Sequence, residues 1–364
     1  MANTSRACPL NKDKLLLFFP KAPDWGWISR IKAKYPGLEV IWACSSKEDG
    51  QLLDFDDLPA EYWKGITMLF VDWAPPPARL LSSVRFIQLA SAGADLWHGH
   101  PTYLDKDVVI SNASGVYTPQ IAEWVIGTWL MSQRHFLRYQ KQMDEQYWET
   151  CSVPMVEDSY GLRMGILGYG SIGRQCARLA GALGMEVYAY TRSERSTPES
   201  RKDDNYQQFC VPGTGDPEGV IPSKWFHGSS EESINTFLAQ DLDILVISLP
   251  LTEDTEGLIS HKQFKILSKK KTFLTNIARG RHVDTQALLT ALEKGQIRGA
   301  ALDVTDPEPL PKEHALWKAP NVYITPHVSW FTKKVWDRSL GILESNLERL
   351  NDNKPCINVL ANRH

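Results

Sequence analysis

The chain has 364 residues, of which 43% are hydrophobic and 23% charged, ordinary values for a soluble globular protein of one or two domains. Its formal net charge of -3 gives no electrostatic reason to expect nucleic acid or a membrane surface as a partner. The six cysteines have no metal-ligand spacing and no secretory segment opens the chain, so we expect a reduced, cytoplasmic protein without a bound metal.

The first part of the chain alternates short apolar runs with turn signals, as parallel α/β proteins do. We expect strands at "KLLLFF", "VIWAC", "ITMLFV", "RFIQLAS" and "VVISNAS". A long helix is predicted to begin near Pro119, because proline is favoured at the first helical position and residues 120–139 keep an apolar stripe at helical spacing. This helix would bridge two domains.

A second α/β series begins at "RMGILG" and continues through "MEVYAY", "DILVISL", "KTFLTNIA", "IRGAALDV" and "NVYITP". The alternation predicts a doubly wound nucleotide-binding domain. Residues 330–350 again show helical periodicity, and their place after the last strand predicts that the chain returns to the first domain.

Residues from about 195 to 229 do not follow this alternation. They are rich in Ser, Pro, Gly, Asp and Lys and have little apolar periodicity, which predicts a surface insertion without much regular structure. The alternative is a loop that binds a partner, since long loops often carry function.

The run "GYGSIG" follows a predicted strand and opens a predicted helix, the context that a dinucleotide-binding turn requires. Gly168 would make the tight turn, Gly170 would let a pyrophosphate approach the backbone, and Gly173 would let the helix pack on the strand. The helix amino terminus would supply N–H groups and partial positive charge to the phosphates. A glycine-rich turn without a ligand is the alternative.

The next strand ends in "AYTRSER", where NAD enzymes usually place a carboxylate for the ribose hydroxyl groups. Thr191 stands in that place, and Arg192, Ser193 and Arg195 are candidates to bind a 2′-phosphate through charge-assisted contacts. The sequence therefore favours NADPH (NADP+), with NADH as a weaker alternative. If the turn is only a solvated basic surface, either cofactor could be used.

Three polar residues follow strands at the edge where parallel sheets bind ligands. Arg279, after "TFLTNIA", could hold the carboxylate of a 2-oxo acid with a geometry that lysine lacks. His327, after "VYITP", could donate a proton to the carbonyl oxygen, and Glu308 could hold the other imidazole N–H. Each residue alone would more often be structural, but together with a dinucleotide turn they favour catalysis.

With these four runs in order, the chain resembles the D-isomer-specific 2-hydroxyacid dehydrogenase family, most closely its glyoxylate/hydroxypyruvate reductase A branch. The resemblance implies two Rossmann-like doubly wound α/β domains, with a dinucleotide-binding domain (119–327) inserted into a discontinuous substrate domain (1–118 and 328–364). It also implies that Arg279, Glu308 and His327 are the catalytic trio. A homodimer is implied too, with the nucleotide-binding domains and the long helix forming much of the interface.

The resemblance extends to the residues around the trio. Asp303 would contact the nicotinamide carboxamide, and the "SAGAD" run would present backbone N–H groups to the substrate carboxylate. The cofactor set is Gly168, Tyr169, Gly170, Ser171, Ile172, Gly173, Thr191, Arg192, Ser193, Leu249, Pro250, Ala278 and Asp303. The substrate set is Trp73, Ala92, Gly93, Arg279, His327 and Trp330, in which Trp73, from the "DWAPPP" run, is a candidate lid. Trp73 and Trp330 are equally compatible with core packing.

The predicted function is NADPH-preferring reduction of a small 2-oxo acid, such as glyoxylate or hydroxypyruvate, to a D-2-hydroxy acid. Formate dehydrogenases share the fold but carry Gln where this chain has Glu308. Phosphite dehydrogenase has a similar trio, and only the "AYTRSER" and "DWAPPP" runs favour the reductases over it. A nucleotide-sensing corepressor of the same fold would keep the trio as well, and a turnover assay separates it from an enzyme.

Overall fold

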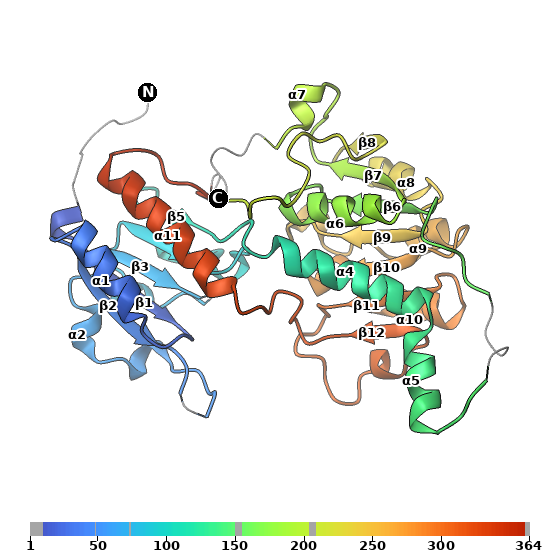
Figure 1. Cartoon of the computed structure of the whole chain (residues 1–364), viewed down its shortest axis with the longest axis horizontal. Helices are drawn as coiled ribbons and strands as arrows, with labels where there is room; N and C mark the ends of the chain where they lie inside the picture. The colour runs from blue at the N-terminus through green and yellow to red at the C-terminus, as the bar shows by residue number, and fades with distance from the viewer. Residues whose placement is uncertain (1–9, 48, 73, 150–154, 204–208, 361–364) are drawn as a thin grey trace. The chain divides into compact units, whose positions relative to one another are not determined.

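A computed structural model describes residues 10–47, 49–72, 74–149, 155–203 and 209–360 of the chain (Figure 1). Two compact units are present. The first comprises Met1–Tyr117, Asn205–Cys210 and Thr332–His364, and the second comprises Thr118–Asp204 and Val211–Phe331. Each unit contains one parallel sheet with helices against it, which confirms the predicted fold of two Rossmann-like α/β domains.

The first unit is built on a five-stranded sheet in the order β2-β1-β3-β4-β5. All four pairings are parallel, and four of the strands are buried along most of their length. The order reverses between β1 and β3, so the ligand crevice of such a sheet lies at the carboxyl ends of these two strands. The bounds are β1 (Lys14–Phe19), β2 (Glu39–Cys44), β3 (Met68–Val71), β4 (Phe86–Leu89) and β5 (Val109–Ser111).

Helices cover both faces of the first sheet. Trp27 and Ile31 of α1 (Trp25–Lys34) pack with Leu343 and Leu347 of α11 (Val335–Asn351) on one face. The short helices α2 (Ala60–Trp63) and α3 (Pro101–Leu104) contribute Trp63 and Tyr103 to the other apolar layer. Because α11 belongs to this unit, the chain returns to it after the second sheet.

The second unit contains a seven-stranded parallel sheet in the order β12-β11-β10-β9-β6-β7-β8. Its order reverses between β6 and β9, which places the ligand crevice at the carboxyl ends of that pair. The bounds are β6 (Arg163–Leu167), β7 (Glu186–Thr191), β8 (Lys224–His227), β9 (Ile244–Ile247), β10 (Phe273–Asn276), β11 (Gly299–Leu302) and β12 (Val322–Ile324).

Two layers of helices bury this sheet (Figure 1). On one face α4 (Thr118–Gln133) packs against α6 (Ser171–Ala182), and Trp129 of α4 meets Phe273 of β10. On the other face lie α8 (Glu231–Leu238), α9 (His261–Leu267) and α10 (Thr285–Glu293). Their apolar residues form the larger part of the core of this unit.

A helix does begin near Pro119, as predicted, but it does not continue to residue 139 as a single helix. The helix α4 ends at Gln133, and after two residues α5 (Phe136–Asp144) begins. Between them His135 has a left-handed backbone with φ of +56°, which breaks the helical ladder. The sequence pattern could not show this break because the apolar stripe continues across it.

The stretch 195–229, expected to be a surface insertion with little regular structure, contains two short regular elements that the sequence did not predict. Its described residues include α7 (Pro198–Arg201) and the edge strand β8, which pairs with β7 along its whole length. The backbone N–H of Phe209 donates to Asn358 Oδ1 (2.8 Å) in the first unit. The strand was missed because only Trp225 and Phe226 are apolar between Pro222 and Gly228.

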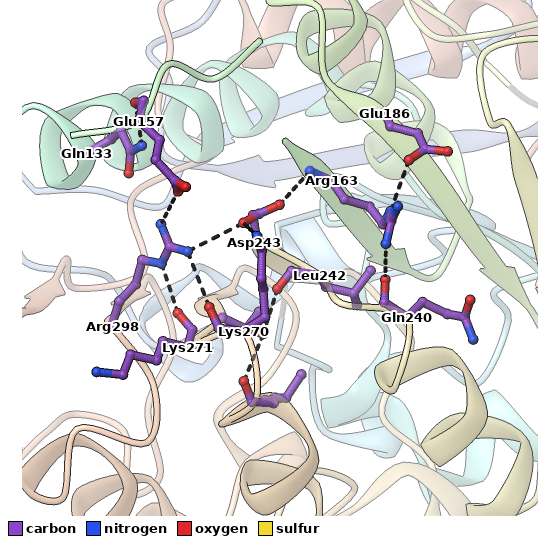
Figure 2. Close-up of polar contacts among 12 residues, drawn as sticks. Gln133, Glu157, Arg163, Glu186, Gln240, Leu242, Asp243, Lys270, Lys271 and Arg298 are labelled. Atoms are coloured by element: carbon purple, nitrogen blue, oxygen red, sulfur yellow. Dashed lines mark hydrogen bonds and ion pairs between the residues drawn. The ribbon is translucent and has the colours of Figure 1, made fainter. Parts of the chain in front are cut away.

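Charged side chains join the amino ends of the neighbouring strands of the second sheet (Figure 2). Asp243, which is 3% exposed, accepts from the backbone N–H of Arg163 (2.8 Å) and pairs with Lys270 (3.4 Å) and Arg298 (3.5 Å). These four residues precede or begin β6, β9, β10 and β11. The network therefore fixes the strands at the edge opposite to the one that binds ligands.

Candidate active site

The glycine turn after β6 has the geometry of a phosphate-binding turn. Gly168 has φ of +103° and donates its N–H to the carbonyl of Tyr190 (3.1 Å). A Cβ on Gly168 would lie 2.7 Å from the carbonyl oxygen of Ser248, and one on Gly173 would lie 2.3 Å from the carbonyl oxygen of Gly168. Both glycines are therefore required by close backbone packing.

Gly170 differs from its two neighbours because the space beside it is open. It is the N-cap of α6, and no atom of the described residues lies within 4 Å of the position that its Cβ would take. The first N–H groups of α6, from Ser171 and Ile172 on, have no acceptor within the helix and carry its positive dipole end. With Leu249 and Pro250 after β9, these groups flank the point where the strand order reverses. The turn fits a dinucleotide pyrophosphate.

The end of β7 carries the candidate ribose residues. Thr191 donates its hydroxyl to the carbonyl of Ser193 (2.7 Å), and Arg192 is exposed beside it. Arg195 donates to the carbonyl of Ser200 (2.5 Å), so its guanidinium contacts the α7 turn. His227, a residue that sequence reasoning missed, pairs in register with Thr191 and ends β8 at the same edge.

Arg279 follows β10 on a turn that Asn276 holds from inside. The Asn276 amide accepts from the N–H of Ala278 (3.1 Å) and donates to the carbonyl of Arg279 (2.8 Å). A Cβ on Gly280 would lie 2.0 Å from the carbonyl oxygen of Thr305, so this turn packs directly on the backbone that leads to Glu308. Asn276 is a second residue that the sequence did not reveal.

His327 and Glu308 meet as the sequence suggested: Nδ1 of His327 lies 2.6 Å from Oε1 of Glu308. Partial burial raises the pKa of Glu308, but the hydrogen bond and charge of His327, with smaller effects from a Thr305 backbone hydrogen bond and the charge of Arg279, outweigh burial and hold the pKa below its usual value. Glu308 is thus ionised at neutral pH. The carboxylate of Glu308 thus interacts with His327 directly and lies within electrostatic reach of Arg279.

The backbone of His327 is held in an unusual conformation. Its φ is +55°, and its N–H donates to the carbonyl of Asp303 (2.8 Å). The Asp303 carboxylate, 2% exposed, accepts from Thr325, Val328 and Ser329 on the same segment. Asp303 therefore positions the His327 segment, and its contact with a nicotinamide carboxamide stays a prediction.

Trp330 is partly buried and supports the same segment. Its indole N–H donates to the carbonyl of His327 (2.7 Å), and its own carbonyl accepts from Gln120 of α4 (3.1 Å). These contacts link the segment to α4 within the second unit. A role for Trp330 in shaping the substrate pocket stays a prediction.

The other substrate candidates belong to the first unit. Asn112 donates to the carbonyl of Ala92 (2.7 Å) and Ser91 donates to the carbonyl of Gly93 (2.7 Å), which orders the loop after β4. Trp73 lies outside the described residues. Its neighbour Asp72 follows β3 at the carboxyl edge, and burial raises the pKa of Asp72 to about 6.

Two kinds of feature are not found in the part of the chain that the structure describes. Within it, no group of three or more His, Cys, Asp or Glu side chains is placed to hold a metal ion. The helices found there are all too short or too polar to cross a bilayer.

The two parallel sheets and the glycine turn after β6 together define a two-domain α/β protein with a dinucleotide-binding sheet. Residues 126–210 and 222–329 match the family described as D-isomer specific 2-hydroxyacid dehydrogenase, NAD binding domain. The chain belongs to the D-isomer specific 2-hydroxyacid dehydrogenase family, as its motifs predicted, and is an NAD(P)-dependent enzyme.

Relatives of known name align along most of the chain. It is 25% identical to hydroxypyruvate reductase of Blautia hydrogenotrophica (90% of this chain, 94% of that one). It is 26% identical to glyoxylate/hydroxypyruvate reductase A of Escherichia fergusonii (94% and 96%). The structure of the NADPH-dependent glyoxylate/hydroxypyruvate reductase of Sinorhizobium meliloti in complex with NADP and sulfate superposes with a TM-score of 0.70 at 26% identity (96% and 98%).

Proposed function

We propose that this enzyme reduces small 2-oxo acids, of the glyoxylate and hydroxypyruvate class, to D-2-hydroxy acids, and that it prefers NADPH to NADH. The observation that carries the proposal is the 2.6 Å contact between His327 and Glu308, within electrostatic reach of Arg279, in the sheet that carries the glycine turn. The relatives named as glyoxylate and hydroxypyruvate reductases support the substrate class. The NADP complex of the Sinorhizobium relative supports the cofactor.

Each residue of the trio would have one task. The Arg279 guanidinium would bind the substrate carboxylate and fix the direction of the carbonyl group. Glu308 accepts at Nδ1 of His327, which leaves Nε2 as the atom that would donate a proton to the carbonyl oxygen. The bound nicotinamide supplies the hydride. The backbone N–H groups of Ala92 and Gly93 would add donors for the carboxylate, as the family resemblance implies.

The cofactor would lie on the glycine turn and the strand ends beside it. Gly170 and the amino end of α6 would hold the pyrophosphate. Thr191, Arg192 and Ser193 would face the adenosine ribose, where Arg192 would bind a 2′-phosphate. The missing carboxylate at the end of β7 removes the group that would repel this phosphate.

The carboxylate role of Arg279 has a direct test in Arg279→Lys. Lysine keeps the charge but loses the planar pair of donors, so we expect KM for the 2-oxo acid to rise and kcat to fall. A charge-assisted hydrogen bond is worth about 1.5–3 kcal/mol, which predicts a loss of roughly ten- to hundredfold in kcat/KM. Arg281→Lys, the same change at an exposed position paired with Glu256, is the matched control. Unchanged kinetics in Arg279→Lys would show that the carboxylate is bound elsewhere.

We also propose a homodimer, with α5 as part of its interface. No residue of α5 is buried, even though the helix carries large apolar side chains. Phe136 and Met143 are 55% and 71% exposed, and Trp148 beyond the helix is 91% exposed. Large apolar side chains exposed on neighbouring turns are typical of an interaction site. A second copy of the chain is the occupant that the family resemblance implies.

Light scattering at micromolar concentration should therefore give twice the chain mass of 41.2 kDa. Phe136→Glu combined with Met143→Glu should shift the mass toward the monomer, because each change would place a charge in an apolar contact. Leu52→Glu, at an exposed apolar position of the first unit, should leave the mass unchanged. A monomeric wild-type chain would refute the dimer.

A further inference from the structure

The segment 211–221 lies outside the part of the chain that matches the family, which covers 126–210 and 222–329. It nevertheless contacts the two elements that form the phosphate-binding site, the glycine turn and α6. Its central residue, Asp216, is 3% exposed although it carries a charge. A buried carboxylate is stable only when it is hydrogen-bonded, so its partners indicate its role.

Asp216 binds the residue in the middle of the glycine turn. The hydroxyl of Tyr169, between Gly168 and Gly170, donates to Oδ2 of Asp216 (2.8 Å). The same carboxylate accepts from the backbone N–H groups of Val220 and Ile221 (3.1 Å each), which closes the segment around it. The Tyr169 side chain is 5% exposed.

Two further groups enclose the Tyr169 ring. The Arg174 guanidinium lies over it, 5.0 Å from the ring centroid, and the Trp225 ring meets it edge to face at 5.0 Å. Arg174, on the first turns of α6, also donates to the carbonyl of Asp216 (2.5 Å). One residue of α6 thus contacts both Tyr169 and the segment.

The segment is joined to α6 at two more positions. The N–H of Gly215 donates to Oε1 of Gln175 (2.6 Å), and its carbonyl accepts from Arg178 (3.0 Å). Arg174, Gln175 and Arg178 lie on one side of the helix, within its first two turns. The segment therefore fixes α6 and the turn before it as one body.

We propose that the segment 211–221 is a brace for the cofactor site, in which Asp216 and Tyr169 are positioning residues for the pyrophosphate-binding turn. The physical reason is preorganisation: a turn already held in its binding conformation loses less entropy when it binds the phosphates. The inference rests on the proposed function only in taking the turn as the cofactor site. It adds a role for a segment that the family pattern does not contain.

The test is the dissociation constant of NADPH and of NADH, measured by fluorescence titration of the whole protein. Tyr169→Phe removes only the hydroxyl. Asp216→Asn turns one of the two oxygens that accept from Tyr169, Val220 and Ile221 into an amide donor. We expect each variant to raise both dissociation constants about tenfold, by analogy with the loss of one hydrogen bond to a charged group. The ratio of the NADPH dissociation constant to the NADH dissociation constant should not change, because both cofactors contain the pyrophosphate. KM for the 2-oxo acid at saturating cofactor should stay within about twofold.

Two controls separate this role from simple stabilisation. Glu218→Gln changes an exposed carboxylate of the same segment, paired with Lys202 (3.4 Å), and should leave both dissociation constants unchanged. The double variant Tyr169→Phe with Asp216→Asn should bind no more weakly than the weaker single variant, because both remove the same contact.

Dissociation constants within about twofold of wild type in Tyr169→Phe, whether or not its melting temperature falls, would overturn the inference. If Asp216→Asn does not fold, the dissociation constants of Tyr169→Phe alone test the inference. A wild-type protein that binds neither dinucleotide would instead refute the proposed function, so the two failures are distinguishable.

Discussion

Replacing His327 by alanine should lower kcat for 2-oxo acid reduction by about 100- to 10,000-fold, the usual contribution of a general acid. The proton donor is lost, whereas the glycine turn after β6 keeps its contacts. The dissociation constant of the cofactor should therefore stay near that of wild type. Steady-state kinetics and a fluorescence titration of the same preparation measure both quantities.

A second substitution separates chemistry from backbone strain at this position. His327 has φ of +55°, a conformation that asparagine adopts more readily than alanine does. His327→Asn should therefore fold at least as well as His327→Ala and be as inactive, because it also lacks the acid. His261→Ala, at an exposed position on α9, is the matched control and should be fully active. A near-normal rate in either His327 variant would remove His327 from the mechanism.

The unmodified enzyme should prefer NADPH to NADH by about ten- to hundredfold in kcat/KM. A charge-assisted contact between Arg192 and a 2′-phosphate is worth about 1.5–3 kcal/mol, and each 1.4 kcal/mol is a factor of ten. Changing Thr191 to Asp together with Arg192 to Ala should then shift the preference toward NADH, because a ribose acceptor is restored and the phosphate contact is deleted.

The comparison needs both cofactors with one substrate, in the wild type and in the double variant. Arg195→Ala is an informative third variant, because Arg195 donates to the carbonyl of Ser200 and should contribute less to cofactor choice than Arg192. Equal use of NADPH and NADH by the wild type would mean that Arg192 does not contact the phosphate. The assignment of the "TRSER" turn would then be wrong.

Periodicity in the sequence predicted most of the fold because strands of a parallel sheet are buried on both faces. Apolar runs such as "KLLLFF" and "DILVISL" coincide with β1 and β9. The sequence did not predict β8, because it is an edge strand of four residues, two of them exposed, and its apolar run is short. The sequence did not predict the helix break at His135, because a change in local backbone conformation does not alter the spacing of apolar residues.

Some contacts of the candidate site could also be predicted from the sequence, and others could not. The positions of Glu308 and His327 after predicted strands identified both as candidates, and the structure brings them within 2.6 Å of each other. The contact between Tyr169 and Asp216 joins residues 47 positions apart, and Asp216 lies in a stretch with little apolar periodicity, so no local pattern could predict it. Trp73 lies outside the described residues, and its role as a lid stays a prediction.

The measurement that tests the central claim most directly is a turnover assay of the purified protein with a panel of 2-oxo acids, each supplied with NADPH and with NADH. We expect rapid NADPH oxidation with glyoxylate or hydroxypyruvate, slower oxidation of NADH, and a D-2-hydroxy acid as the product wherever the product is chiral. Binding of NADPH without turnover of any 2-oxo acid in the panel would contradict this expectation and favour a nucleotide-sensing protein of the same fold.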